Sequence, residues 1–182
     1  MKRRHFLQVS LIAPSLIGEV QKPSPIRSKK GFKIDDNKDR FDKEIAFLGG
    51  RFLCKVSAKD TNGDLCIYDT FRMQKGGLPL HYHHSQDEWF YVMEGEFLIK
   101  VGEDTFHLKP GDSAFGPRKV PHTFANVSKG TGRIMIVFQP AGTMEAFFEE
   151  ASKLTNPTPE ALQKISHAHG SEIIGPPLDI NK

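Results

Sequence analysis

Two histidines and a carboxylate stand within eight positions of one another in an otherwise strand-like stretch. Residues two apart in an extended chain share a face, so His81 and His83 point the same way. Glu88 can join them from the next strand, once the chain has turned through residues 85–87. Two neutral imidazoles and a carboxylate on one side of a sheet form a ligand set for a divalent transition metal, and such sets usually leave positions open for water or substrate. His84 falls on the opposite face by the same parity and is interpreted as a surface or rim residue.

A second stretch offers a fourth ligand. Residues 110–126 run through a turn, a short apolar strand and a second turn before His122 enters a strand. Together the two stretches resemble the paired signature of the cupin superfamily, whose first motif runs glycine, His-x-His, glutamate, glycine and whose second runs glycine, proline, glycine, histidine, asparagine. Carried over position by position, this resemblance implies that His81, His83, Glu88 and His122 bind one divalent transition metal per chain. Imidazole and carboxylate suit iron, manganese, cobalt, nickel, copper and zinc alike.

The chain departs from the family pattern at two positions. Gly76 lies one residue closer to His81 than the usual spacing, and Lys119 stands where the second motif has glycine. Lysine resists the positive φ that glycine adopts readily, so the usual shape of this turn does not follow from the pattern.

The elements that must position these ligands are short strands at regular spacing, separated by turns. We expect them at residues 52–56, 65–73, 97–101, 105–108, 113–115, 122–127 and 133–138, in addition to those that carry His81, His83 and Glu88. This spacing predicts an all-β barrel or sandwich. The resemblance implies, more specifically, a double-stranded β-helix, or jelly roll, whose interior carries the metal.

The only two cysteines lie on the two arms of a predicted hairpin, whose turn is expected at residues 60–64. Counting outward from this turn places Lys59, and not Cys54, opposite Cys66. A disulfide is therefore not implied, and two buried thiols are the favoured interpretation. A bond between Cys54 and Cys66 stays open if the register differs.

The chain divides into four parts: an export signal at 1–20, a linker and arm at 21–43, the barrel at 44–141, and C-terminal helices with a tail at 142–182. Met144, Phe147, Phe148 and Ala151 fall at helical spacing, and a second helix is predicted from Thr158 to near Gly170. We expect both helices to pack on the outside of the barrel or to cover its mouth, and residues 171–178 to form an extended tail.

The N-terminus has the layout of a bacterial export signal. Arg3 and Arg4 precede an apolar stretch too short to span a bilayer, and they resemble a twin-arginine address. The leader predicts a periplasmic or exported protein; the alternative is a cytoplasmic protein with a basic N-terminus. Because three charges of the net +3 lie at residues 2–4, we expect no basic face for nucleic acid. We also expect no stable membrane insertion.

Strand parity from the ligands directs Phe90 and Phe124 inward. Either they line a substrate pocket or they simply fill a small barrel. Trp89 and Tyr91 point outward, which suits packing against another sheet layer, a partner subunit or the C-terminal helices. The family resemblance implies a homodimer.

The motif pair resembles that of quercetinase-like dioxygenases, in which the glutamate both binds the metal and accepts the substrate's proton. Glu88 would take both roles, and the substrates would be dioxygen and an enolic aromatic or flavonol-like small molecule. One alternative is another cupin metalloenzyme, of the oxalate-handling or sugar-isomerising kind. The other is a non-catalytic protein that binds a small molecule. A shared fold does not separate these alternatives.

Overall fold

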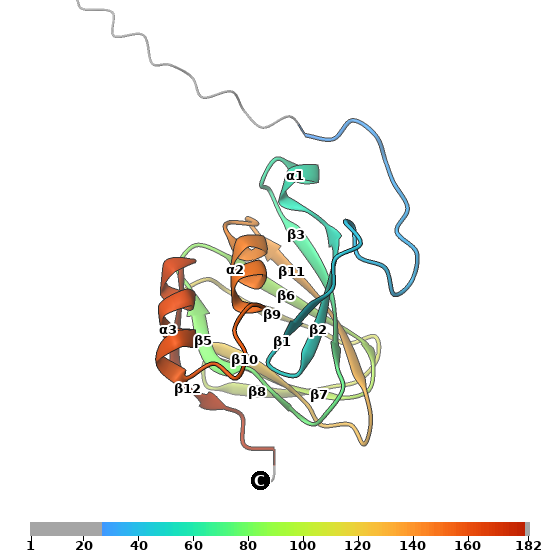
Figure 1. The fold of residues 1–182 in the computed structure, drawn as a ribbon. Coiled ribbons are helices and arrows are strands. Elements are labelled where there is room, and N and C mark those ends of the chain that lie inside the picture. The colour runs from blue at the N-terminus through green and yellow to red at the C-terminus, as the bar shows by residue number, and fades with distance from the viewer. Residues whose placement is uncertain (1–26, 181–182) are drawn as a thin grey trace, which may run out of the picture.

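The computed structural model describes residues 27–180, which form two antiparallel six-stranded sheets that enclose a common core (Figure 1). The all-β jelly roll with C-terminal helices predicted from the sequence is confirmed. The first sheet has the strand order β1 (Ile45–Phe47), β2 (Gly50–Val56), β3 (Cys66–Arg72), β11 (Gly132–Gln139), β6 (Asp87–Glu94), β9 (Ser113–Gly116). The second has the order β12 (Ser171–Pro177), β5 (Pro79–His83), β10 (His122–Asn126), β7 (Phe97–Val101), β8 (Asp104–Leu108), with β4 (Gly76–Gly77) paired to β10.

Alternation of apolar and polar side chains explains why these segments are strands with one face inside. On β11, Ile134, Ile136 and Phe138 are buried, and the residues between them face outward. All five residues of β10, the strand that begins with His122, are buried. The strand that carries His122 therefore lies at the centre of the core.

The tight hairpin turn predicted at residues 60–64 is wrong, because the connection between β2 and β3 contains a short helix. Residues Ala58–Thr61 make a short helix, α1, because Ser57 and Asp60 form a capping box in which each side chain accepts a hydrogen bond from the other's backbone N–H. Asn62 ends the helix with φ of 60°. The residues that were interpreted as a tight turn therefore include the end of a short helix.

The helix changes the register of β2 against β3 from the one predicted, but the two cysteines still do not form a disulfide. Cys54 lies opposite Tyr68, and a bulge separates this pair from the next one, Val56 with Ile67. Cys54 and Cys66 are free and buried. Burial raises the pKa of the Cys54 thiol to about 12, so it stays protonated and unreactive at neutral pH.

Two helices follow the barrel, α2 (Met144–Ala151) and α3 (Pro159–Ala168), close to the predicted positions. Phe148 on α2 packs against Phe52 and Tyr68 of the first sheet. Residues 171–177, predicted as an extended tail, form β12 and pair with β5. The helices and β12 lie together at one end of the barrel (Figure 1).

The N-terminal arm is held to the barrel by Asp39, whose buried carboxylate accepts hydrogen bonds from the backbone N–H of Cys54 at 2.6 Å and of Phe41 at 2.7 Å. The predicted export signal at residues 1–20 lies outside the described residues, so export stays a prediction. Between residues 27 and 180, no helix is long and apolar enough to cross a membrane.

Candidate metal centre

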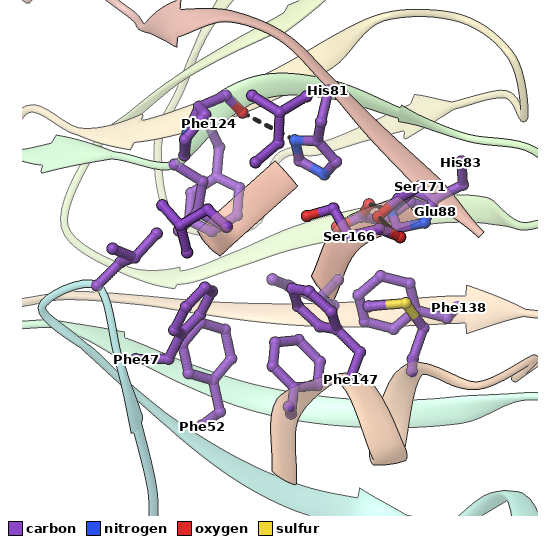
Figure 2. Close-up of a pocket in the computed structure, with 18 residues that line it drawn as sticks. Phe47, Phe52, His81, His83, Glu88, Phe124, Phe138, Phe147, Ser166 and Ser171 are labelled. Carbon is purple, nitrogen blue, oxygen red and sulfur yellow. Dashed lines mark hydrogen bonds and ion pairs between the residues drawn. The ribbon is translucent and has the colours of Figure 1, made fainter. Parts of the chain in front are cut away.

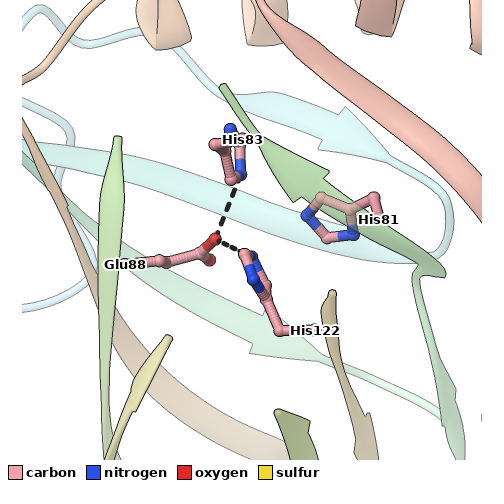
Figure 3. Close-up of side chains that lie close together, drawn as sticks. All are labelled: His81, His83, Glu88 and His122. Atoms are coloured by element: carbon pink, nitrogen blue, oxygen red, sulfur yellow. Dashed lines mark hydrogen bonds and ion pairs between the residues drawn. The ribbon is translucent and has the colours of Figure 1, made fainter. Parts of the chain in front are cut away.

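Three of the four residues predicted as ligands, His81, His83 and Glu88, line one side of a cavity inside the barrel (Figure 2). β5 and β10 are neighbours in the second sheet, with His81 directly opposite His122. Glu88 reaches the same point from β6 of the first sheet, which brings the four side chains together (Figure 3). One donor atom from each of His81, His83, Glu88 and His122 lies within 4.8 Å of those of the others.

Backbone carbonyls orient two of the imidazoles. His81 Nδ1 donates to the carbonyl of Pro79 at 2.8 Å, and His122 Nδ1 donates to that of Val120 at 2.9 Å. A carbonyl only accepts, so the proton sits on Nδ1 and Nε2 is left to face the centre of the cluster. Metal-binding histidines commonly have their second nitrogen fixed in this way.

Glu88 lies between two of the histidines. One of its carboxylate oxygens is 2.9 Å from His122 Nε2 and 3.2 Å from His83 Nε2. Burial acts to raise the pKa of Glu88, but the hydrogen bonds from His122 and His83 outweigh it and hold that pKa well below its usual range. The carboxylate is thus ionised at physiological pH, as a ligand must be.

The pKa values of the His81 and His122 imidazoles shift in opposite directions, although burial acts to lower both. Burial, together with the nearby His122 and His83, lowers the pKa of His81 to about 3, which keeps that ring neutral. Burial also acts to lower the pKa of His122, but the hydrogen bond and charge of Glu88 raise it overall. A divalent cation beside Glu88 would compete with the proton that His122 shares with this carboxylate.

The turn before His122 has the left-handed backbone despite its lysine. Lys119 has φ of 65°, and its N–H donates to the carbonyl of His83 at 2.7 Å. The neighbouring Arg118 makes a bidentate pair with Asp87, with distances of 3.0 and 2.6 Å. These contacts bind the turn to the strands that carry His83 and Glu88, and they offset the conformational cost of about 1–2 kcal/mol for a non-glycine residue.

The donor set fits a divalent transition metal. Three imidazoles and one carboxylate converge, and the ring nitrogens of His83, of which 2% is exposed, have no polar contact in the described residues except Glu88, 3.2 Å from Nε2. A buried polar group without a partner is costly unless something else binds it. Because all the donors are nitrogen or oxygen, the set suits iron, manganese, cobalt, nickel, copper or zinc.

Apart from His81, His83, Glu88 and two serines, the wall of the cavity is apolar. Its wall consists of His81, His83, Glu88, Phe47, Leu48, Phe52, Leu78, Pro79, Phe124, Ile136, Phe138, Met144, Phe147, Phe148, Leu162, Ser166, Ser171 and Ile173. Phe124 is therefore in the wall. Phe90 is not, since it is fully buried behind His122 and Phe124, with ring centroids 6.1 and 5.8 Å away.

The C-terminal helices were expected to pack on the outside of the barrel or to cover its mouth, but none of their residues was predicted to line the cavity. Phe147 and Phe148 of α2, Ser166 of α3, and Ser171 and Ile173 of β12 all line it. The helical spacing of the two phenylalanines was a usable signal for a buried helix face. No local pattern marks the two serines, because their placement depends on how α3 and β12 dock.

The chain matches known proteins in its barrel region. A family model described as "Cupin domain" matches residues 69–138, a range that includes all four predicted ligands. An uncharacterized protein of Streptomyces coelicolor is 35% identical over 111 residues, which are 61% of this chain and 96% of that protein. An uncharacterized protein of Methanocaldococcus jannaschii is 31% identical over 61 residues, 34% of this chain and 49% of that protein, so the match spans about half of the archaeal relative.

Among solved structures, an RmlC-like cupin from Shewanella frigidimarina has a TM-score of 0.49 and 23% identity, over 64% of this chain and 96% of that one. Other matching structures bear the names of an oxalate oxidase, a polyketide cyclase and sugar phosphate isomerases. One fold hosts many chemistries, so the reaction must be argued from the site. By its paired motifs and its match to the cupin family model, the chain is a member of the cupin superfamily.

Proposed function

We propose that this protein is a metal-dependent dioxygenase that acts on a small enolic aromatic molecule. One observation carries the proposal: His81, His83 and Glu88 form the polar side of a cavity whose other walls are almost wholly apolar. No Lys, Arg or Asp lines this cavity in the part of the chain that the structure describes. Oxalate and sugar phosphates carry anionic groups that proteins bind with Arg or Lys. The walls thus favour an apolar substrate over either of them.

A redox-active metal, when bound, would supply electron exchange between an enolate and dioxygen. Glu88 is the group placed to accept the hydroxyl proton of the enol, because it is ionised and lies in the cavity wall. The hydrogen bonds that keep it ionised also make it a weak base, and a weak base accepts a proton readily only from an acidic donor. An enol hydroxyl is far more acidic than the alcohol and C–H groups of a sugar.

The size of the cavity, about 50 Å³, limits what it can hold as it stands. One water needs about 10–15 Å³, whereas benzene occupies an engineered cavity of about 150 Å³. An aromatic ring would enter only if the elements that cover the cavity, α2, α3 and β12, shifted outward. A single-ring enol requires a smaller shift than a flavonol and is therefore the preferred substrate.

The test is oxygen consumption by protein reconstituted separately with iron, manganese, cobalt, nickel, copper and zinc. Single-ring enols, catechols, diketones and flavonols would be compared with oxalate and sugar phosphates. We expect oxygen uptake with an enol and at least one redox-active metal. Conversion of oxalate or a sugar phosphate with no oxygen uptake from any enol would replace this proposal with a different metalloenzyme, and tight ligand binding without any turnover would indicate a binding protein.

The role of Glu88 is tested by Glu88→Gln, which keeps the shape but removes the basic carboxylate. We expect turnover to fall by about 10²–10⁴-fold, the usual contribution of a general base, and substrate binding to fall much less. Metal content must be measured in the same preparation, because a lost ligand would imitate a lost base. Unchanged turnover in a fully metallated variant would exclude Glu88 as the proton acceptor.

A further inference from the structure

Ser166 occupies an unusual place in the cavity wall. It lies on α3, and 4% of it is exposed. Its backbone carbonyl accepts a hydrogen bond from the Ser171 hydroxyl at 3.2 Å, and Ser171 is paired in the sheet with the ligand His83. Ser166 is thus linked to the metal centre through one hydrogen bond and one strand pair. Figure 2 shows its hydroxyl directed into the cavity.

This hydroxyl has no partner in the protein. Within residues 27–180, the Ser166 side chain makes no hydrogen bond. A serine in a helix commonly bonds to the carbonyl four residues back, here that of Leu162, and this bond does not form.

Neither helix stability nor packing explains a serine at this position. Alanine has the higher helix propensity and would suit a wall made of Phe147, Phe148 and Leu162. Ser171, the other serine of the wall, has its hydroxyl engaged by the protein. The Ser166 hydroxyl is therefore the one free hydrogen-bonding hydroxyl that the described wall offers to a molecule in the cavity.

We propose that Ser166 hydrogen-bonds an oxygen of the substrate other than those that bind the metal. The inference rests on the proposed function and makes it more specific: the preferred substrate is an apolar ring with a metal-chelating pair of oxygens and a further carbonyl or hydroxyl oxygen. A water can satisfy the hydroxyl while the cavity is free of substrate. A ligand that displaces this water without replacing its hydrogen bond binds less tightly.

The test uses two probes of similar shape that differ by one oxygen. Dihydroxyacetophenones carry a catechol and a carbonyl, and ethylcatechols carry the same catechol without the carbonyl; the 3- and 4-substituted isomers of each cover two positions of the extra oxygen. Binding is measured by titration calorimetry to zinc-loaded protein, which does not depend on oxygen chemistry. The matched variants are Ser166→Ala and Ser171→Ala.

We expect Ser166→Ala to weaken binding of one acetophenone isomer by about two- to tenfold relative to its ethyl counterpart, as for the loss of one hydrogen bond. Ser171→Ala should leave this ratio unchanged, even if it lowers stability, and Ser166→Thr should retain the preference. Taking the ratio cancels any general damage to the cavity. Equal effects of Ser166→Ala on both probes, or none, would overturn the inference. If no catechol binds the metal-loaded wild-type protein, the proposed substrate class itself fails.

Discussion

At the scale of single residues, His83 depends most on a bound metal. It is buried, its carbonyl is held by Lys119 N–H, its Nδ1 has no hydrogen bond, and the only polar group near its Nε2 in the described residues is Glu88 at 3.2 Å. His81 and His122 differ in that their Nδ1 atoms are satisfied by carbonyls. A metal at the cluster would bind His83 Nε2 in place of this single contact with Glu88.

The sequence offers a matched control for this residue, because His84 is next in the chain and exposed, with its Nε2 3.2 Å from Glu172. We predict that His83→Ala loses at least about tenfold in metal affinity, whereas His84→Ala retains the wild-type affinity. The measurement is metal content by elemental analysis after dialysis, together with a competition titration. Full metal content in the His83→Ala protein would show that the cluster is not the metal site.

The clustering of His81, His83, Glu88 and His122 could be predicted because strand parity and motif spacing are local properties of the chain. Parity also directed Phe90 and Phe124 inward, but it could not tell that only Phe124 would reach the cavity. That difference depends on depth in the barrel, since Phe90 packs against Phe124, which itself lines the cavity. Ser166 could not be found, because nothing near it in sequence indicates what α3 packs against.

At the scale of elements, β12 is the main support of the strand that carries two ligands. β5 pairs with β12 from Ser171 opposite His83 to Pro177 opposite Pro79, whereas its pairing with β10 consists of His81 opposite His122. β12 also lines the cavity through Ser171 and Ile173. Without β12, β5 would be an edge strand with most of its backbone unpaired on that side.

We predict that a chain ending at Gly170 loses at least about tenfold in metal affinity, although all four ligands remain. The matched control ends at Pro177 and should bind metal as the full chain does. Metal titration is paired with urea unfolding of the metal-free proteins, which shows whether each shortened chain is still folded. A folded chain ending at Gly170 with unchanged metal affinity would contradict the role given to β12.

The strands were largely predictable because the period-2 pattern is strong in both sheets. β12 was missed as a strand because Gly175, Pro176 and Pro177 are poor strand formers, and its register shifts at two places. Pro is tolerated there because β12 is the edge of its sheet. The short helix α1 was missed because its capping residues, serine and aspartate, are also common in turns.

At the scale of the whole molecule, the outer face of the first sheet carries a row of apolar residues. Phe115, Trp89, Val137 and Ile67 lie opposite one another across four adjacent strands. Phe115 is 56% exposed and Trp89 36%, and Trp89 stacks on Tyr91. Three coverings were expected for the outward Trp89 and Tyr91: a sheet layer, the C-terminal helices or a partner subunit. In residues 27–180 the second sheet packs on the inner face of the first sheet, and the helices lie at the end of the barrel, so neither covers this outer face. Of the three expected coverings, a partner subunit is the one that we develop into a prediction.

We therefore predict a homodimer in which this row meets its counterpart on a second copy of the chain. Because the row continues to the edge strand β9, two copies can bury it by packing face to face. The double variant Trp89→Lys, Phe115→Lys should be monomeric, since it places like charges in the contact, and it should keep its metal because neither residue is a ligand. Phe106→Lys, on β8 of the other sheet and 44% exposed in the wild-type protein, is the control and should remain dimeric. Light scattering coupled to gel filtration measures the mass of each protein. A wild-type protein that is monomeric at every accessible concentration would rule out this face as the interface. A double variant that stays dimeric would do the same.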